Sequence, residues 1–207
     1  IRAGALFDGT GESLRRDVTI LVRDGRIIDV GPNVAVPANA ERIDLSGGTV
    51  MPVFIDLHTH LTGGPSDFEM PPGAFLYTEY PEASVLKGVV NARTTLLAGF
   101  TTVRDVGAPA TSALALRDAI AKGLLPGPRM VTAIGLGTTG SHCDPTTGIR
   151  PGHVNVDAWR DRVYDGPAAA ASAVRAAVRD GADVIKVCAT AGVLSITDEI
   201  GPAQMTF

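Results

Sequence analysis

From residue 51 onward, short apolar runs alternate with Ala-rich stretches that are compatible with helices. This alternation is typical of βα units around a parallel sheet, because parallel strands need a crossover connection between them. We expect strands at about 53–58, 101–105, 129–134 and 183–188, and helices at about 82–98, 111–122 and 167–180. Pro167 suits the first turn of the last helix and Gly181 its end. The sequence therefore predicts an α/β fold.

The first fifty residues have a different sequence pattern and are predicted to form short strands joined by turns. The β-branched run 18–22 is followed by Asp24-Gly25 and then by the run 27–30. Asp-Gly in this setting predicts a hairpin with a type I′ turn, which needs positive φ at both central residues. We therefore expect a small β domain over 1–50 and a second domain over 51–207.

Composition and charge exclude several classes of protein. The chain has 207 residues, of which 45% are apolar and 19% charged, as in a globular protein with a sizeable core. Its net charge of −4 argues against a nucleic-acid partner. No apolar run approaches the roughly twenty residues of a membrane-spanning helix, so we expect no membrane partner. The composition leaves the compartment open between cytoplasm and periplasm, with a preference for the cytoplasm.

Two histidines, His58 and His60, stand at the end of an apolar run. Residues two apart on a strand share a face, so Asp56, His58 and His60 should point the same way. Imidazole nitrogen is a good ligand for zinc and similar metals, and a strand end would hold the pair rigidly. We interpret the pair as metal ligands. A pair of satisfied or solvent-exposed histidines is the alternative.

A second polar residue, Lys186, interrupts the apolar strand 183–188. In a central barrel strand both faces are buried, so a lysine there is costly unless it is paired or chemically altered. Its amine could add carbon dioxide to give a carbamate that bridges two cations, or form a Schiff base with a carbonyl substrate. The alternative is a lysine that reaches the barrel mouth and pairs with an acid such as Asp105.

The two cysteines, Cys143 and Cys188, are too few for a disulfide-built scaffold and lack the paired spacing of a thiolate zinc site. Cys188 lies two residues after Lys186 on the predicted strand. We interpret it as a buried free thiol, which usually has a packing role only.

Three segments together carry a family resemblance. The segment 51–60 resembles the metal motif of the amidohydrolase superfamily, and 184–195 resembles the carboxylated-lysine segment of its prolidase-like branch. This branch includes Xaa-Pro dipeptidases and relatives of imidazolonepropionase. The segment 101–105 also fits, so the resemblance covers essentially the whole chain. It implies a small β-sandwich domain followed by a (β/α)8 TIM-type barrel, with the site at the carboxyl ends of the strands.

The resemblance also implies a site with two divalent metals, for which zinc is the expected ion. In such enzymes the pair matching His58 and His60 ligates the more buried metal. The residue matching Lys186, as its carbon dioxide adduct, bridges both metals and is catalytic. A bridging hydroxide attacks the amide carbonyl. The implied substrates are small dipeptides, often Xaa-Pro, or other N-acyl amino acids, and a homo-oligomer is expected because relatives are often multimeric.

Another candidate lies in the segment 136–166, which is rich in Gly, Pro, Thr and His. A loop of this length inside a compact domain is usually functional or disordered. Within it, His142 lies where the family carries a histidine that contacts the substrate carboxylate. The alternative is a solvated loop histidine.

The chain departs from the family pattern at two positions, Val53 and Ala191, where glycines are usual. A need for positive φ there would strain these residues, Val53 more than Ala191. In addition, only four of the eight barrel strands are expected before Phe207, and Asp198 is the one later candidate ligand. We expect the C-terminal half of the same barrel to complete the site, with this chain as the N-terminal part.

Two other function classes remain open. A Schiff-base lyase would use Lys186 alone and make the histidine pair incidental. A metal-free binding or scaffold protein could use the same fold. Trapping with borohydride would detect the first, and stoichiometric metal would exclude the second.

Overall fold

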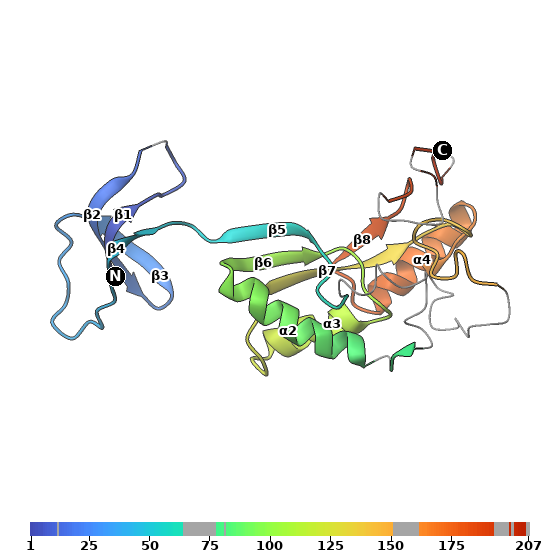
Figure 1. The fold of residues 1–207 in the computed structure, drawn as a ribbon, viewed down its shortest axis with the longest axis horizontal. Coiled ribbons are helices and arrows are strands. Elements are labelled where there is room, and N and C mark those ends of the chain that lie inside the picture. The colour runs from blue at the N-terminus through green and yellow to red at the C-terminus, as the bar shows by residue number, and fades with distance from the viewer. Residues whose placement is uncertain are drawn as a thin grey trace. The chain divides into compact units, whose positions relative to one another are not determined.

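The computed structural model describes residues 1–11, 13–63, 78–80, 82–150, 162–192, 199 and 201–205. The chain divides into two compact units, Ile1–Val53 and Phe54–Phe207, each built on its own four-stranded sheet (Figure 1). This organisation confirms the predicted fold class, an α/β chain with a small β domain and part of a TIM-type barrel.

The first unit is a mixed sheet in the order β3-β2-β1-β4. Its strands are β1 (Arg2–Leu6), β2 (Arg15–Arg23), β3 (Arg26–Gly31) and β4 (Asp44–Val50). The β1 and β4 strands are parallel and the other pairs antiparallel. Between β2 and β3, Asp24 and Gly25 have φ angles of 49° and 71°. The turn residues therefore have the two positive φ angles that the predicted type I′ hairpin requires.

The second unit contains every strand and helix expected after residue 51, with ends that differ from the expected ones by two residues at most. The parallel strands run in the order β5-β6-β7-β8. They are β5 (Phe54–Thr59), β6 (Phe100–Asp105), β7 (Arg129–Leu136) and β8 (Val184–Val187). The helices are α2 (Ala83–Leu97), α3 (Ser112–Ala121) and α4 (Pro167–Arg179). None of the helices in the described residues is long and apolar enough to span a membrane.

Two apolar clusters join these helices to the sheet. In Figure 1, α2 and α3 lie on the same side of β6 and β7. The cluster beneath them contains Val103 and Leu116, both fully buried. A second cluster joins α3 and α4 to β7 through Leu114, Leu136 and Ala173. Because burial of such side chains contributes about 1.5–3 kcal/mol each, these clusters hold the helices against the sheet.

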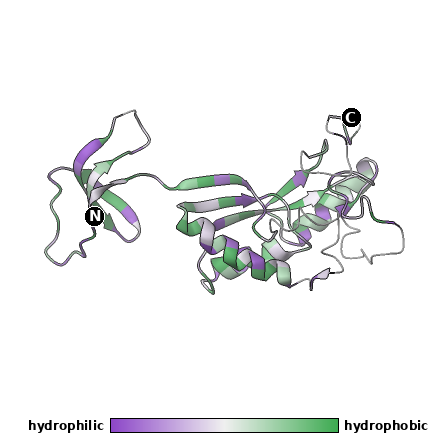
Figure 2. Ribbon diagram, viewed as in Figure 1, coloured by the Kyte–Doolittle hydropathy of each residue, from purple (hydrophilic) through white to green (hydrophobic). Residues whose placement is uncertain are grey.

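The strands at the two edges of the second sheet remain exposed. On β5, Ile55 is 59% and Leu57 56% exposed, and this strand shows green hydrophobic bands in Figure 2. At the other edge, β8 pairs only with β7 among the described residues, and its Lys186 is half-buried. The expectation that Lys186 lies in a central barrel strand stays a prediction, because the described residues contain a strand on only one side of β8.

The two departures from the family's glycines do not strain the backbone. Neither Val53 nor Ala191 has a positive φ, so neither position requires glycine for its backbone angles. The strand after Val53 does change register by one step between Phe54 and Ile55. Asp198, the one later candidate ligand, lies outside the described residues.

Candidate metal centre

The sheet brings the predicted site residues to one edge. Because the strands β5 to β8 are parallel, their carboxyl ends meet on the same side of the sheet. His60 directly follows β5, Asp105 is the last residue of β6, and Lys186 is the last but one of β8. His58 lies within β5, one residue before its end.

A β-bulge shapes the strand that carries the histidines. Asp56 pairs with Val103 and Thr59 with Asp105, so β5 has one residue more than β6 in this interval. Instead of bonding to β6, the His58 N–H donates to Oδ1 of Asp56 at 2.9 Å. Strict two-residue alternation therefore stops at the bulge.

The two imidazole rings nevertheless lie close together. The ring centroids of His58 and His60 are 5.4 Å apart, and the rings meet edge to face at 63°. On the neighbouring strand, Nε of Arg104 donates to the carbonyl oxygen of Leu57 at 2.8 Å, which holds the residue between the bulge positions against β6. The pair is close enough for both rings to contact one bound ion.

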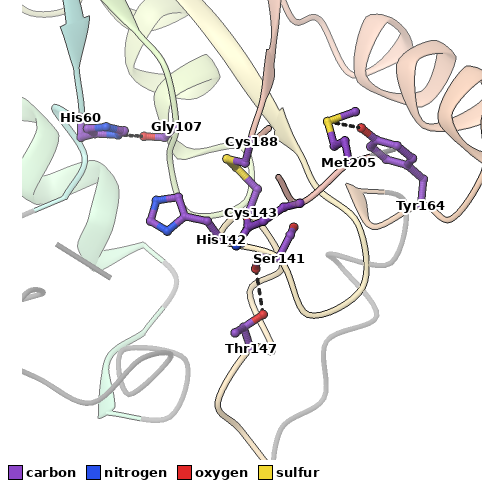
Figure 3. Close-up of a disulfide and its surroundings, with 10 residues drawn as sticks. His60, Gly107, Ser141, His142, Cys143, Thr147, Tyr164, Cys188 and Met205 are labelled. Carbon is purple, nitrogen blue, oxygen red and sulfur yellow. Dashed lines mark hydrogen bonds between the residues drawn. A yellow bond between two sulfur atoms is a disulfide. The ribbon is translucent and has the colours of Figure 1, made fainter. Parts of the chain in front are cut away.

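The orientation of His60 is fixed by Gly107. The Nδ1 atom of His60 lies 2.8 Å from the Gly107 carbonyl oxygen, which can only accept a hydrogen bond (Figure 3). A neutral His60 ring would therefore carry its proton on Nδ1 and leave Nε2 free for a metal. A Cβ on Gly107 would lie 3.2 Å from Cε1 of the ring, so a glycine at this position lets the ring lie against the backbone.

Asp105 anchors the backbone on both sides of this contact. The side chain is fully buried, and its Oδ2 accepts the Leu61 N–H at 2.7 Å while Oδ1 accepts the Gly107 N–H at 3.3 Å. Burial raises the pKa of Asp105, and the two backbone hydrogen bonds and His60 offset only part of that effect. In the described residues no ion pair joins Asp105 to Lys186, so the pairing considered as an alternative role for Lys186 is not formed there.

The surroundings of His58 favour its neutral form. Desolvation lowers the pKa of His58 first, and the positive charges of Lys186 and Arg104 and the neighbouring His60 lower it further. A neutral imidazole is the form that binds a metal, so this environment suits a ligand.

His142 lies on the loop after β7 and is exposed. Its backbone N–H donates to Oε1 of Gln204 at 2.9 Å, and a Cβ on Gly192 would lie 2.8 Å from Cε1 and Nε2 of its ring. The adjacent Cys143 forms a disulfide with Cys188. The interpretation of Cys188 as a free thiol is therefore wrong, because the loop folds back and brings Cys143 next to it (Figure 3).

The described residues bring two imidazoles together but do not form a complete set of metal ligands. Within the described ranges, no group of three or more His, Cys, Asp and Glu side chains could hold an ion by itself. The donor chemistry still fits a metal, because two imidazoles converge and the Gly107 carbonyl oxygen orients the ring of His60. Sequence reasoning missed the supporting contacts of Gly107 and Gly192, since only the fold shows which ring each glycine touches.

Comparison with known proteins identifies the family. Residues 49–207 match the model of the amidohydrolase family. The chain belongs to the amidohydrolase family, as its motifs led us to expect. A Xaa-Pro dipeptidase with bound methionine superposes with a TM-score of 0.86 at 33% identity, over 99% of this chain and 50% of that one. A prolidase in complex with N-methylphosphonate-L-proline gives a TM-score of 0.83 at 28% identity, with the same coverage.

Curated relatives match over shorter segments. A dihydroorotase from Mycobacterium tuberculosis is 51% identical over 51 residues, which cover 25% of this chain and 11% of that protein. An imidazolonepropionase from Salinispora tropica is 46% identical over 48 residues, which cover 23% and 12%. The chain therefore spans about half the length of the solved structures and a smaller part of these curated relatives.

Proposed function

We propose that this chain belongs to a metal-dependent hydrolase that cleaves the amide bond of dipeptides, chiefly Xaa-Pro dipeptides, or of N-acyl amino acids. The observation that carries the proposal is the convergence of His58 and His60, 5.4 Å apart, with the Nδ1 of His60 held by Gly107. A second half of the barrel would supply the remaining ligands, since zinc usually takes about four.

Each candidate residue at the carboxyl ends of the strands, and His142 on the loop after β7, has a role in this proposal. His58 and His60 would hold a divalent ion, zinc by preference, through neutral imidazole nitrogens. When bound, such ions lower the pKa of water and polarise the amide carbonyl. Lys186 would add carbon dioxide at its neutral amine, forming an N–C bond and releasing a proton, and so present two anionic oxygens. His142, as a hydrogen-bond donor, would bind the substrate carboxylate.

The choice of dipeptides rests on the extent of the similarity. The likeness to a Xaa-Pro dipeptidase and to a prolidase covers 99% of this chain, whereas the curated dihydroorotase and imidazolonepropionase align over about a quarter of it. Dihydroorotate and imidazolonepropionate are therefore the comparison substrates, and Xaa-Pro dipeptides are the first to test.

The test uses the protein with its complete barrel, purified with zinc and bicarbonate. We expect hydrolysis of Xaa-Pro dipeptides and loss of at least about 100-fold in kcat/KM in both His58→Ala and Lys186→Ala, because each removes a group that holds a metal. Lys122→Ala is the matched control, since Lys122 is an exposed residue that follows α3. It should keep full activity.

The other function classes give different results in the same experiment. A Schiff-base lyase would be trapped on Lys186 by borohydride in the presence of a carbonyl substrate, and His58→Ala would leave it active. A scaffold protein would contain no stoichiometric metal and would hydrolyse nothing. Hydrolysis that persists in both His58→Ala and Lys186→Ala would refute the proposal.

A further inference from the structure

The disulfide lies between the strand of Lys186 and the loop of His142. Cys188 follows Lys186 by two residues at the end of β8, and Cys143 directly follows His142. The bond joins residues 45 positions apart, with Cα atoms 5.7 Å from each other. It therefore links the loop that follows β7 to the carboxyl end of the adjacent strand β8, at the proposed site.

The loop fits closely over the end of β7 at the disulfide. A Cβ on Gly137 would lie 2.8 Å from the Cβ of Cys143, and a Cβ on Gly135 would lie 3.8 Å from its Sγ. On the far side of the loop, Thr139 Oγ1 donates to Oδ2 of Asp165 at 2.7 Å. The disulfide therefore attaches the loop covalently on the side that is nearer to the proposed site.

The same attachment controls where His142 lies. The His142 ring rests on Gly192, four residues after Cys188, and its N–H bonds to Gln204. In Figure 3 the ring is turned away from the disulfide, to the side on which His60 lies. Since His142 is exposed and lies on a loop, these contacts limit how far its ring can move.

We propose that the Cys143–Cys188 disulfide positions His142 and thereby sets the affinity of the site for substrates with a free carboxylate. This inference rests on the proposed function, in which His142 binds that carboxylate. The physical reason is pre-organisation, because a donor already held in place loses less conformational entropy when the ligand binds. Cys143 and Cys188 act here as positioning residues and do not touch the reacting bond.

The experiment removes the bond in the complete enzyme by the double substitution Cys143→Ser and Cys188→Ser. For a Xaa-Pro dipeptide, KM should rise about tenfold while kcat stays within about twofold, because a charge-assisted hydrogen bond is weakened in binding only. For the same dipeptide with an amidated C-terminus, KM should not change. His142→Ala should raise KM similarly, and the combination with the double substitution should add little.

A matched control loosens the other side of the loop. Thr139→Val removes the hydrogen bond of the hydroxyl to Asp165, keeps the bond of the Thr139 N–H to the same carboxylate and leaves the disulfide intact, so KM for the dipeptide should remain near the wild-type value. If Thr139→Val raises KM as much as the double substitution, the effect is general loosening of the loop and the proposal is overturned.

A second readout does not depend on activity. Non-reducing peptide mapping should recover the Cys143–Cys188 peptide pair, and hydrogen exchange at residues 138–147 should accelerate in the double variant. If that variant does not fold, mild reduction and alkylation of the folded wild type replace it. Free thiols at both cysteines in the native protein, or unchanged exchange after removal of the bond, would overturn the proposal.

These readouts separate the two proposals. A wild-type enzyme that hydrolyses no dipeptide refutes the proposed function, and the exchange experiment then still decides whether the disulfide positions the loop. Equal KM changes for the free and the amidated dipeptide would also overturn the inference, because the carboxylate would then not be what the disulfide affects.

Discussion

Gly107 accepts a hydrogen bond from His60 at a place where a side chain on residue 107 would crowd the same ring. The Gly107 carbonyl oxygen lies 2.8 Å from Nδ1 of His60, and a Cβ on the same residue would come within 3.3 Å of that nitrogen. The backbone just after the neighbouring strand β6 thus orients the ring, across 47 positions in the sequence. Such an outer contact fixes the tautomer and the direction of a metal ligand.

Substitution of Gly107 by Ala should weaken metal binding. The added methyl group must displace the His60 ring by a few tenths of an ångström, which we expect to lower zinc affinity about tenfold. Titration of the metal-free complete enzyme with zinc measures this. The matched control is Gly47→Ala, where a Cβ meets nothing within 4 Å. Equal zinc affinities for the two variants would contradict the orienting role of Gly107.

Removal of the Asp105 carboxyl group should destabilise the fold. Asp105→Ala leaves the backbone N–H groups of Leu61 and Gly107 unpaired in a buried place, which should cost about 2–4 kcal/mol. Asp105→Asn should cost less, because it removes the charge that burial disfavours and retains one acceptor. Urea unfolding of the three proteins gives the order. A stability of Asp105→Ala equal to wild type would show that these bonds contribute nothing.

An ionic network at the amino-terminal end of β8 should make stability depend on pH. Oδ2 of Asp183 accepts from Arg117 Nη1 at 2.9 Å and from the Thr132 N–H at 2.8 Å. Burial alone would raise the pKa of Asp183, but the hydrogen bonds from Thr132 and Arg117 outweigh it and lower the pKa below its ordinary value of 3.8.

The sign of the effect follows from this lowered pKa. The folded state prefers the ionised carboxylate, so Asp183 contributes stability above pH 3.8 and loses it as the pH falls through and below that value. Asp183→Asn should therefore cost about 1 kcal/mol at pH 7, since the side chain is 40% exposed. The difference in the free energy of unfolding between Asp183→Asn and the wild type should vanish well below pH 3.8. Asp180→Asn, directly after α4, is the control. A difference in stability between Asp183→Asn and the wild type that stays constant at all pH values would contradict the expectation.

The buried hydroxyl of Ser141 should be dispensable. The residue is 2% exposed, and its Oγ has no hydrogen-bond partner in the described residues. Because an unpaired buried hydroxyl is unfavourable, Ser141→Ala should leave the melting temperature unchanged or raise it. In contrast, Thr132→Val removes a buried hydroxyl that bonds to Arg117 and Asp183, and should lower stability by about 1–3 kcal/mol. A larger loss of stability in Ser141→Ala than in Thr132→Val would contradict the view that the Ser141 hydroxyl is unpaired and the Thr132 hydroxyl is bonded.

Local patterns predicted most of the fold. The Asp24-Gly25 hairpin and the helix that begins at Pro167 depend on the backbone preferences of a few neighbouring residues, which a single sequence contains. The proximity of His58 and His60 agrees with the expectation from their spacing, although the bulge in β5 interrupts the alternation on which that expectation was based. Their role as metal ligands stays a prediction, as do the roles of Lys186 and His142.

Contacts between distant residues were beyond sequence reasoning. The disulfide joins positions 45 apart, and Cys143 and Cys188 have no spacing that signals a pair. The bulge in β5 arises where the His58 N–H bonds to Asp56 instead of the neighbouring strand. The half-buried state of Lys186 depends on which strand lies beside β8, a property of the assembled sheet.

The most direct test of the central claim is an anomalous difference map from diffraction data collected at the X-ray absorption edge of zinc. It would use crystals of the complete enzyme grown with zinc and bicarbonate. Our account predicts a peak about 2.0–2.1 Å from the Nε2 atoms of His58 and His60, with extended density on the Lys186 amine for the carbon dioxide adduct. A map with no peak at the two histidines, or with zinc bound only elsewhere, would contradict the claim that this strand edge is a metal site.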